Sequence, residues 1–573
     1  MAVIKMNKSS SRRTWFRRIA WALCLFAVAL IVLTCAASWY IDWACCAVPP
    51  TVNIKQPLPV PQVHQTDDGY RHLGNCYLGK KDGILRMRLT GDSFSLGYYN
   101  AVLTGQLIQQ QEMSLLDTVR SHVPSRINLW LLTKYVLLRN RNLPSFIPRE
   151  YQIEIYGMSV GYEDPFPGVY PLYHRLLNYH AAHDISHAVM DTPLVGCTSF
   201  AAWGSATNNG HLLLARNFDF NAGRCFDENK VVVYFKPDQG LGFISVAWPG
   251  MVGVVSGINE AKIAVTVNAA SSADSRTIGT PVSLLIRDVM QHASTLDQAV
   301  KTIEQSSVFV SDSYLVADGK CGRAVVVEKT PRRSSVRPPS DGDEDFIICS
   351  NHFLSDELKN DQKNLRYMAE GTSVERYNRT EGLVRSFYGF LSPQLAGEIL
   401  RDRKLPQSDI LGLGNDAQIN PFIATHSVII DVTDGIIWVS SSPHQLGRFI
   451  PFSLSDFEQA IGAEQIPPDP VLASGEYDRY LQAADLLSKA QSLLSKSSAD
   501  EAAGLLRQAE QLNPVLYLPP FLLGKIAFDG NKWEQARTFL SKAQALYPPF
   551  GSQRSEISRM LNHIDKEQAK RKN

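Results

Sequence analysis

The sequence predicts a layered α+β core that follows one transmembrane helix and precedes an α-helical region. Three patterns carry this prediction: strand-like segments around a pair of helical ones in residues 197–465, an uncharged run in residues 19–41, and a 34-residue echo in residues 475–562. Many antiparallel strands that enclose two helices are typical of layered α+β domains, because each sheet needs a second layer to bury its apolar face.

The composition excludes several broad classes of protein. Of the 573 residues, 45% are hydrophobic and 20% are charged, which is ordinary for a folded chain and excludes global disorder. Lys and Arg total 57 against 56 Asp and Glu, so no net field attracts a polyanion, and we expect no nucleic-acid partner. Nine cysteines are too few for a disulfide scaffold in so long a chain, although a pairing of Cys321 with Cys349 stays open.

The N-terminus has the features of a membrane anchor. Residues 1–18 form a basic tail with six Lys or Arg and no acidic residue, and residues 19–41 follow without a charge, a glycine or a proline. As a helix with a rise of ~1.5 Å per residue, this run spans about 34 Å, enough for a bilayer core of about 30 Å. The basic tail favours the cytoplasm, so we expect everything after Asp42 outside, in the periplasm or on the surface of a bacterial cell. A cleaved signal peptide and a lipoprotein modified at Cys35 stay open as alternatives.

Two segments connect this anchor to the core. Residues 42–74 contain five prolines between Pro49 and Pro61, which predicts a stiff, extended linker. Residues 75–196 alternate as a strand over positions 84–90 and are then mainly helical, with several prolines that interrupt the helical pattern.

The C-terminal region resembles tetratricopeptide repeats. Within residues 475–562, Ala502 and Ala509 recur 34 positions later as Ala536 and Ala543, and a proline closes each unit. Two helix pairs are fewer than the three repeats that usually stand alone, so we expect them to pack on the core or on a protein partner. Residues 563–573 are predicted to form a solvated, charged tail.

The segment with the most specific pattern begins the strand-rich core. Gly196-Cys197-Thr198-Ser199 opens a predicted strand, and Asn208-Asn209-Gly210 is a strong hairpin signal before the next strand. Because the two strands of a hairpin pair, Arg216 and Asp219 are expected near Cys197. A guanidinium favours a thiolate over a thiol, and a carboxylate can hold an ammonium group. An inert buried cysteine and an ordinary Arg–Asp pair stay open as alternatives.

This segment resembles the start of the mature chain in N-terminal-nucleophile cysteine hydrolases, which include penicillin acyl-coenzyme A acyltransferases, bile-salt hydrolases, acid ceramidase and N-acylethanolamine amidase. Further segments similar to the penicillin acyltransferase-like family follow in that family's order over roughly residues 85–450. They are Leu89–Asp92, Gly97-Tyr98, Trp248–Gly250, Gly257–Glu260, Val265–Asn268, Asn351–Phe353 and Ser373–Arg376. The resemblance implies a layered αββα fold and self-cleavage between Gly196 and Cys197.

The chemistry of such a site explains these residue types. A cysteine made N-terminal carries its own base, because its α-amine, with an ordinary pKa near ~8, can accept the thiol proton. Before cleavage the Cys197 thiol would attack the Gly196 carbonyl, and a glycine tolerates the strained backbone that this attack requires.

The resemblance also assigns the groups that stabilise the oxyanion. Asn268 and Asn351 each end an apolar predicted strand and match the two asparagines of the family's site. Arg376 matches the family's late arginine more loosely, since Thr372 stands where a serine is common. Turn-capping asparagines and a surface arginine stay open as alternatives.

No metal or organic cofactor is implied for this chemistry. His180, His183 and His187 share one predicted helical face with Asp184 nearby, and such a face could bind a metal ion. No further ligand set is evident in the sequence, so a polar helix face is the favoured interpretation.

These observations together predict a membrane-anchored, extracytoplasmic amidase or acyltransferase. Its substrate is expected to be a small acyl amide with a non-peptide carbon–nitrogen bond, such as an N-acyl amino acid or an N-acyl lipid. Two alternatives stay open. One is an inactive scaffold that binds a protein through its C-terminal repeats, and the other is a papain-like protease, which would need a histidine partner that the core does not clearly supply.

Overall fold

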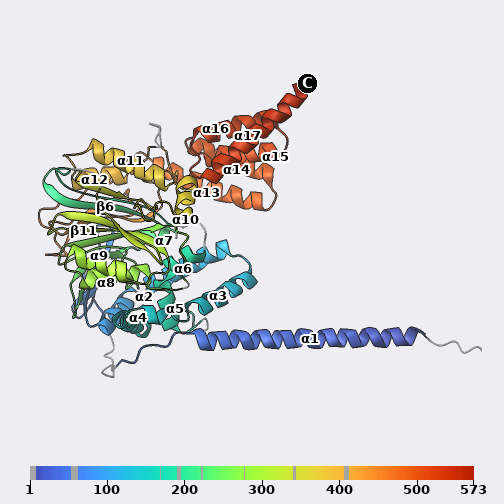
Figure 1. The fold of residues 1–573 in the computed structure, drawn as a ribbon, viewed down its shortest axis with the longest axis horizontal. Coiled ribbons are helices and arrows are strands. Elements are labelled where there is room, and N and C mark those ends of the chain that lie inside the picture. Colours follow the sequence, from blue (N-terminus) through green and yellow to red (C-terminus); the bar gives the residue numbers. More distant parts are fainter. Residues whose placement is uncertain are drawn as a thin grey trace, which may run out of the picture.

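Two β-sheets form the centre of the molecule (Figure 1). The computed structural model describes residues 8–52, 62–167, 170–189, 195–220, 223–276, 278–339, 344–404 and 412–572. In the order of their pairing, the strands of the larger sheet are β1 (His64–Gln65), β2 (Arg71–Leu73), β3 (Cys76–Lys81), β4 (Ile84–Gly91), β7 (Val231–Pro237), β8 (Phe243–Ala247), β9 (Ser256–Asn259), β10 (Ile263–Ala270), β11 (Ser311–Asp318), β12 (Arg323–Lys329) and β13 (Ser334–Arg337). Those of the smaller sheet are β14 (Phe346–Cys349), β5 (Val195–Gly204), β6 (Gly210–Phe220), β15 (Ala424–Asp431), β16 (Ile436–Ser440) and β17 (Phe449–Ser453).

The two sheets pack face to face and bury one apolar core between them. Leu214 of β6 and Ile430 of β15, from the smaller sheet, lie in the same buried cluster as Ile244 of β8 and Val326 of β12, from the larger one. All eight residues of β10 and of β15 are buried, because helices cover the outer face of each sheet. Strands buried on both faces read as apolar runs rather than as alternating ones.

Helices complete the four layers, as Figure 1 shows. On the larger sheet lie α8 (Val282–His292) and α9 (Leu296–Gln305), and on the smaller sheet lie α11 (Ser373–Ser386) and α12 (Pro393–Leu400). Two further helices of this part are α7 (Arg224–Glu228) and α10 (Gln362–Glu370). The prediction of a layered α+β core is therefore confirmed.

The segment before the core contributes more strand than the sequence predicts. Strands β1 to β4 extend the larger sheet, and β4 pairs in parallel with β7, where Leu85 lies opposite Val231. The sheet thus begins at His64, inside the stretch expected to be an extended linker, because Gly69 and Gly74 adopt positive φ angles and allow two tight turns there.

Helices follow these strands, as expected. They are α2 (Ser93–His122), α3 (Arg126–Asn140), α4 (Arg149–Gly161), α5 (Leu172–His180) and α6 (Ala182–Val189), with a short 3₁₀ helix at Leu143–Phe146. Helices α2 and α4 cross closely: a Cβ atom at Gly97 would lie 1.7 Å from the Glu154 carbonyl oxygen, and one at Gly157 would lie 2.1 Å from that of Phe94. Only glycine permits this approach at both positions.

One long helix precedes all of this. Helix α1 covers Lys8–Cys45, and its stretch Trp15–Cys45 is long and apolar enough to cross a membrane; a signal sequence near an N-terminus passes the same test. Figure 1 shows it leaving the layered core as a single rod. Its apolar side chains, including Trp21 and Leu33, are exposed.

The C-terminal region is helical, as predicted, and has an apolar core of its own. After a 3₁₀ turn at Pro470–Leu472 come α13 (Glu476–Ser495), α14 (Ala499–Leu512), α15 (Leu518–Asp529), α16 (Trp533–Ala545) and α17 (Gly551–Lys572). The unit also binds the layered core. The Asn415 side chain donates to the Tyr547 carbonyl (2.9 Å), and the Tyr547 hydroxyl donates to the Glu375 carboxylate (3.0 Å). The assignment to tetratricopeptide repeats stays a prediction.

Candidate active site

Cys197 lies near the start of β5, in the hairpin that this strand forms with β6. Residues directly opposite each other in an antiparallel pair point to the same face, and successive residues point to opposite faces. Three cross-strand pairs surround the cysteine: Gly196 with Asp219, Cys197 with Phe218, and Ser199 with Arg216. The side chains of Cys197 and Arg216 therefore both point into the space between the sheets, whereas Asp219 belongs to the face covered by helices.

The Cys197 sulfur contacts one cation. Nη2 of Arg216 lies 3.4 Å from Sγ, and both side chains are fully buried. The guanidinium also donates to the carbonyl oxygens of Val255 (3.0 Å) and Val267, and its carbon lies 4.2 Å from the centre of the Phe218 ring. These contacts fix the orientation of the Arg216 side chain, so its guanidinium group points toward the Cys197 sulfur.

Burial and charge act in opposite directions on the thiol. Burial raises the pKa of the Cys197 thiol above its ordinary value, and the Arg216 guanidinium partly offsets this rise because a nearby cation favours the thiolate. Burial likewise lowers the pKa of Arg216, and the thiolate form of Cys197 opposes that change.

The backbone of Cys197 is held by a second group of residues, on the helix-covered face. Asn351, which follows β14, accepts a hydrogen bond from the Cys197 N–H (2.8 Å) and another from Nη2 of Arg376 (2.7 Å). Nη1 of Arg376 donates to the Cys197 carbonyl (2.5 Å) and to the Thr198 hydroxyl (2.8 Å). Arg376 lies in the first turns of α11 and is buried, so the surface position that the sequence left open is not the one it occupies.

Asp219 lies beside the peptide bond that precedes Cys197, because it pairs with Gly196 across the hairpin. Its Oδ1 atom is buried and has no hydrogen-bond partner among the described residues. Burial raises the pKa of Asp219 to about 8, although Arg376 and Arg216 act to lower it. A buried carboxyl oxygen without a donor is suited to receive a new cation.

Gly196 itself is not strained in this conformation. Its φ angle lies outside the left-handed region, and a Cβ atom there would lie 3.6 Å from Nη2 of Arg376, which is an ordinary contact. The strained backbone expected at this glycine belongs to the attack on its carbonyl and stays a prediction. Residues 190–194, just before it, lie outside the described residues.

Asn268 is close to Cys197 but does not contact it. From the end of β10, its Nδ2 atom donates to the Ser199 hydroxyl (3.0 Å) and to the Cys349 carbonyl (2.9 Å). Its Oδ1 atom is buried without a hydrogen-bond partner in the described part of the chain. Both N–H groups of Asn268 thus have acceptors in the intact chain. Nδ2 of Asn351 likewise donates to the Ala269 carbonyl (2.8 Å).

Two polar residues that the sequence analysis did not single out, Ser256 and His426, lie beside Arg216. Ser256 of β9 accepts a hydrogen bond from Nη1 of Arg216 (2.7 Å), and Nε2 of His426 lies 3.0 Å from the Ser256 hydroxyl. The His426 ring stacks on Phe218, with 5.2 Å between centroids, and burial lowers its pKa well below the ordinary value. The available signal was the polar run Thr425-His426-Ser427 at the start of the buried strand β15.

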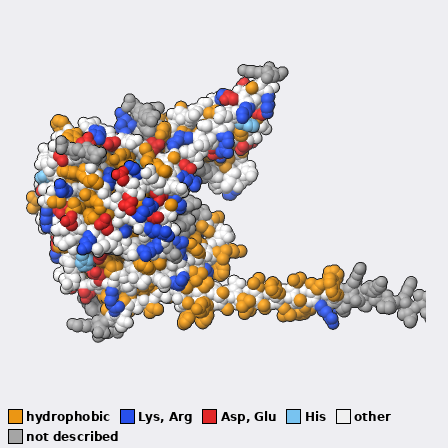
Figure 2. Space-filling view, viewed as in Figure 1, with side chains coloured by type: hydrophobic (Ala, Val, Ile, Leu, Met, Phe, Trp, Pro, Cys, Tyr) orange, Lys and Arg blue, Asp and Glu red, His pale blue; other side chains and the backbone are white. Residues whose placement is uncertain are grey.

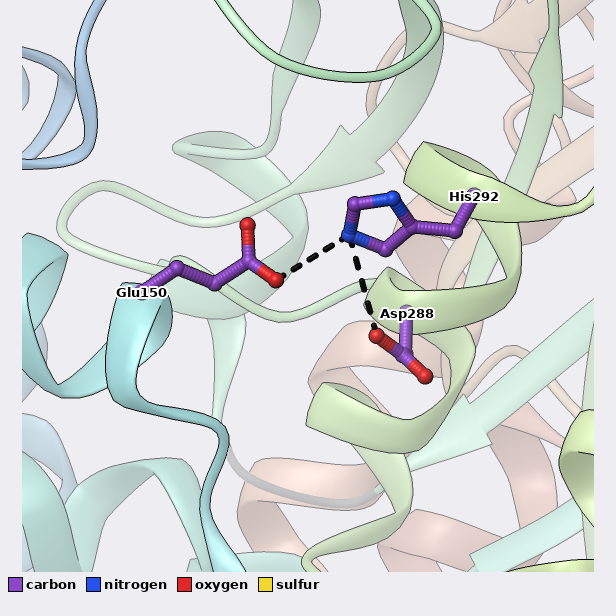
Figure 3. A group of neighbouring side chains, drawn as sticks. All are labelled: Glu150, Asp288 and His292. Atoms are coloured by element: carbon purple, nitrogen blue, oxygen red, sulfur yellow. Dashed lines mark hydrogen bonds and ion pairs between the residues drawn. The ribbon is translucent and has the colours of Figure 1, made fainter.

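Other clusters of titratable groups are accounted for by ion pairs and hydrogen bonds. Figure 3 shows His292 between Glu150 and Asp288, with Nε2 at 3.0 Å from Glu150 and 3.9 Å from Asp288. Nε2 of His180 accepts from the Val252 N–H (2.9 Å), and burial lowers the pKa of His180 to about 4.

The other residues of the predicted histidine face are His183, Asp184 and His187. His183 is partly buried, and Asp184 is fully buried, where its carboxylate accepts from the Val282 N–H (3.1 Å). The side chain of His187 lies outside the described residues.

Comparison with known proteins gives a family match over the core. Residues 205–439 match the family described as acyl-coenzyme A:6-aminopenicillanic acid acyl-transferase. An uncharacterised protein of Archaeoglobus fulgidus is 26% identical over 355 residues, which cover 56% of this chain and 58% of that one. Protein dcd1B of Dictyostelium discoideum is 21% identical over 248 residues, or 38% of this chain and 44% of that one. The chain spans about half the length of these curated relatives.

Similar solved structures include three amidases. The Caenorhabditis elegans ortholog of N-acylethanolamine-hydrolyzing acid amidase is 19% identical, with 41% of this chain and 93% of that chain covered, at a TM-score of 0.30. Penicillin V acylase from Agrobacterium tumefaciens is 15% identical (46% and 89% covered, TM-score 0.31). A mutant of conjugated bile acid hydrolase from Clostridium perfringens is 11% identical (47% and 95% covered, TM-score 0.31).

The matched range begins after Cys197 and β5, but it contains β6 and β14, which pair with β5 on its two sides, and helix α11. It includes Arg216 and Asp219 on β6, Asn268 and Asn351 at strand ends, and Arg376 on α11. Residues 205–439 are therefore similar to the acyl-coenzyme A:6-aminopenicillanic acid acyl-transferase family.

Proposed function

We propose that this chain is a self-processing cysteine amidase or acyltransferase that acts on small, non-peptide acyl amides such as N-acyl amino acids or N-acyl lipids. The observation that carries the proposal is the arrangement at Cys197. Its sulfur contacts Arg216, while Asn351 and Arg376 hold the N–H and C=O groups on its two sides. A buried structural cysteine requires neither a cation at its sulfur nor a polar frame around its backbone.

Maturation begins on the chain's own peptide bond. The Cys197 sulfur attacks the Gly196 carbonyl carbon, and the thiol proton passes to the Cys197 nitrogen as the carbon–nitrogen bond breaks. This step leaves a thioester on sulfur and a free α-amine. Water then attacks the thioester, so that Gly196 ends in a carboxylate and Cys197 regains its thiol.

The new α-amine is the base for turnover. It takes the proton of the Cys197 thiol, the sulfur attacks the acyl carbonyl of the amide substrate, and the proton passes to the departing amine. Water or a second amine then attacks the acyl thioester and releases the acid or a new amide. Asn351 and Asp219 are suited to hold the α-ammonium form, because one already accepts from this nitrogen and the other has a free buried oxygen.

Asn268 and Asn351 are proposed to stabilise the oxyanion. For Asn268 this role requires its N–H groups to exchange the Ser199 or Cys349 oxygen for that of the substrate, since both have acceptors in the intact chain. Release of the segment before Cys197 would open the space in which that exchange can occur. No metal or organic cofactor takes part in these steps.

Helix α1 supports a location at a membrane. We propose that residues 19–41 span the bilayer, with the basic tail in the cytoplasm and the hydrolase core, residues 197–465, outside it. Amphiphilic amides then reach the site from the same surface. After cleavage at Gly196, residues 75–196 belong to the N-terminal fragment as the pro-segment or α chain, and the helices of residues 475–562 offer a surface for a protein partner.

Turnover of chromogenic amides tests this function. Purified chain is assayed with a series of N-acyl-4-nitroanilides of increasing acyl length, and the acyl-enzyme is trapped and mapped by peptide mass spectrometry. The expected acyl adduct is on Cys197, and turnover and adduct both disappear in Cys197→Ala. Cys321→Ala, which changes an exposed cysteine, is the matched control and retains both. A folded chain that neither turns over nor acquires an adduct would instead favour an inactive scaffold.

A further inference from the structure

Helix α3 presents an apolar face to the outside of the molecule. Its sequence places large apolar residues at spacings of three and four, which align on one side of a helix. These exposed residues are Ile127, Trp130, Leu131, Tyr135 and Leu138. Ile127 is 70% and Leu131 52% exposed, and Figure 2 shows hydrophobic side chains in the region of α3, close to the apolar surface of α1.

The side of α3 that contacts the protein includes the buried Leu137 and Asn140 and the partly buried Leu129, Leu132 and Val136. Lys134 is also buried but lies on the same side as the exposed residues, because it follows Leu131 by three positions and precedes Leu138 by four. Nζ of Lys134 pairs with the Asp42 carboxylate, and the Asn140 side chain donates to Asn178 (2.8 Å). The helix thus has apolar groups on both sides, and those of the outer side are covered only in part, where the end of α1 lies against Lys134. A contiguous exposed apolar face of this kind marks a contact with another apolar phase.

The position of α3 identifies that phase. The Lys134–Asp42 ion pair joins the middle of α3 to the end of α1, and the N–H of Ala47 donates to Nδ1 of His174 (2.9 Å), so that α1 continues into the folded core without a slack linker. Figure 1 shows α3 beside the end of α1 that meets the core. On α1, exposed Trp39 and Trp43 occupy this same end, where aromatic rings mark the boundary between lipid and water.

The charge of α3 agrees with a lipid surface. Residues 126–140 contain three basic side chains, Arg126, Lys134 and Arg139, and no acidic one. Helices that lie in a membrane interface combine Trp and Leu on one face with Lys and Arg elsewhere, because the apolar face enters the acyl chains while the cations meet phosphate headgroups.

We propose that the exposed face of α3 is buried in the outer leaflet of a phospholipid bilayer next to α1. This inference rests on the proposed membrane span of α1 and adds a second contact with lipid. Two contacts fix the orientation of the core, whereas a single span would leave the core free to turn about its anchor. The site would then stand at a set height above the surface that supplies its amphiphilic substrates.

Depth-dependent quenching of tryptophan tests the proposal with the full chain. The protein is reconstituted in nanodiscs of anionic phospholipid that carry a nitroxide quencher either near the headgroup or near the end of the acyl chain. Difference spectra between the wild type and single Trp→Phe variants isolate the emission of one residue at a time. Trp130→Phe reports α3, Trp21→Phe reports the cytoplasmic end of the proposed span in residues 19–41, and Trp203→Phe, in β5 far along the chain from α3, is the control.

The expected result is that the shallow quencher reduces the emission of Trp130 by about twofold or more, that it also quenches Trp21, and that neither quencher affects Trp203. Quenching of Trp21 without quenching of Trp130 would overturn the proposal and leave the span intact, and a dimer of the chain in detergent would then assign the face to a second copy. Absence of quenching at both residues would contradict the span, and the α3 proposal with it.

Discussion

The two faces of the β5–β6 hairpin hold different parts of Cys197. Between the sheets, the sulfur meets Arg216, which Ser256 and a backbone carbonyl keep in place. On the face toward α11, Arg376 and Asn351 meet the backbone of the same residue instead. The N–H and C=O groups of a strand residue lie in the plane of the sheet, whereas its side chain stands roughly perpendicular to that plane, so one residue can present its thiol to one environment and its backbone to another.

This difference separates two tasks that would otherwise compete. A cation close to the sulfur favours the thiolate, but a cation equally close to the new α-amine would weaken it as a base. The carboxyl of Asp219 belongs to the amine's face and not to the sulfur's, which suits it to hold an ammonium group. Arg216 contacts the sulfur and Arg376 the backbone, although both guanidinium groups act to lower the pKa of the Cys197 thiol and of Asp219.

The largest expected effect comes from removing the Cys197 sulfur, which acts in both self-cleavage and turnover. Cys197→Ala should leave a single uncut chain with no turnover, because the sulfur performs both the cleavage and the later attack. Cys197→Ser should still be cut, more slowly, since a hydroxyl can carry out the same acyl shift. Gel analysis and mass spectrometry of the purified variants follow the cut. Normal cleavage after Gly196 in Cys197→Ala would assign it to another protease.

The next effect concerns stabilisation of the oxyanion. Asn268→Ala should lower kcat by ~10²–10³ on an amide that the wild type cleaves, which is typical for the loss of one oxyanion donor. The measurement is steady-state kinetics, with circular dichroism to confirm folding. A loss below about fivefold in a folded variant would return Asn268 to a purely structural role, as the bridge between Ser199 and the Cys349 carbonyl.

The sulfur face predicts a shift in pH dependence. Removing the Arg216 cation disfavours the thiolate, so the pKa of Cys197, already raised by burial, should rise further. The pH profile of self-cleavage after cell-free synthesis should then move to higher pH by about 1–3 units in Arg216→Leu and by less in Arg216→Lys. An unchanged profile in a folded Arg216→Leu chain would show that this guanidinium does not act on the thiol.

The amine face predicts a change in stability with pH in the uncut chain. The pKa of Asp219 is raised to about 8 from an unfolded value of 3.8, so the folded state retains the proton between these two values. The contribution to stability is therefore complete below about pH 4 and is lost as the pH rises to about 8. In a Cys197→Ala background, Asp219→Asn should reduce this loss by an amount on the order of a few kcal/mol. Thermal unfolding in detergent at pH 5 and pH 8 measures it, and parallel pH dependence of both chains would contradict the assignment.

The smallest effect is expected at the residue before the cut. Gly196→Ala should slow self-cleavage by less than about threefold, because the added Cβ atom makes only an ordinary contact with Arg376 and the backbone needs no left-handed conformation. Rates from cell-free synthesis provide the comparison. A complete block would show that the attacking conformation differs from that of the intact chain.

The sequence predicted those features of the site that depend on local pairing. The Asn208-Asn209-Gly210 turn sets the β5–β6 register, and this register brings Arg216 and Asp219 beside Cys197. Contacts between distant segments could not be predicted in the same way. Arg376 reaches Cys197 from 179 residues away, through the packing of α11 on the smaller sheet. The direction of a side chain there depends on tertiary contacts that a local pattern does not encode.

The extra strands and the histidine on the sulfur side were missed for the same reason. Pairing of β4 with β7 joins Leu85 to Val231, and a parallel pair between such distant segments has no turn signal. His426 reaches Ser256 only after β15 has paired with β6. In the sequence it is one of three consecutive polar residues, Thr425, His426 and Ser427, before an apolar run.

The central claim is that Cys197 becomes the first residue of a mature chain. The most direct test is N-terminal sequencing of the purified full-length gene product, combined with its intact mass. The account predicts two fragments, one of which begins Cys-Thr-Ser-Phe, from Cys197 onward, with a free amine. A single folded chain that keeps the Gly196–Cys197 bond after prolonged incubation would contradict it.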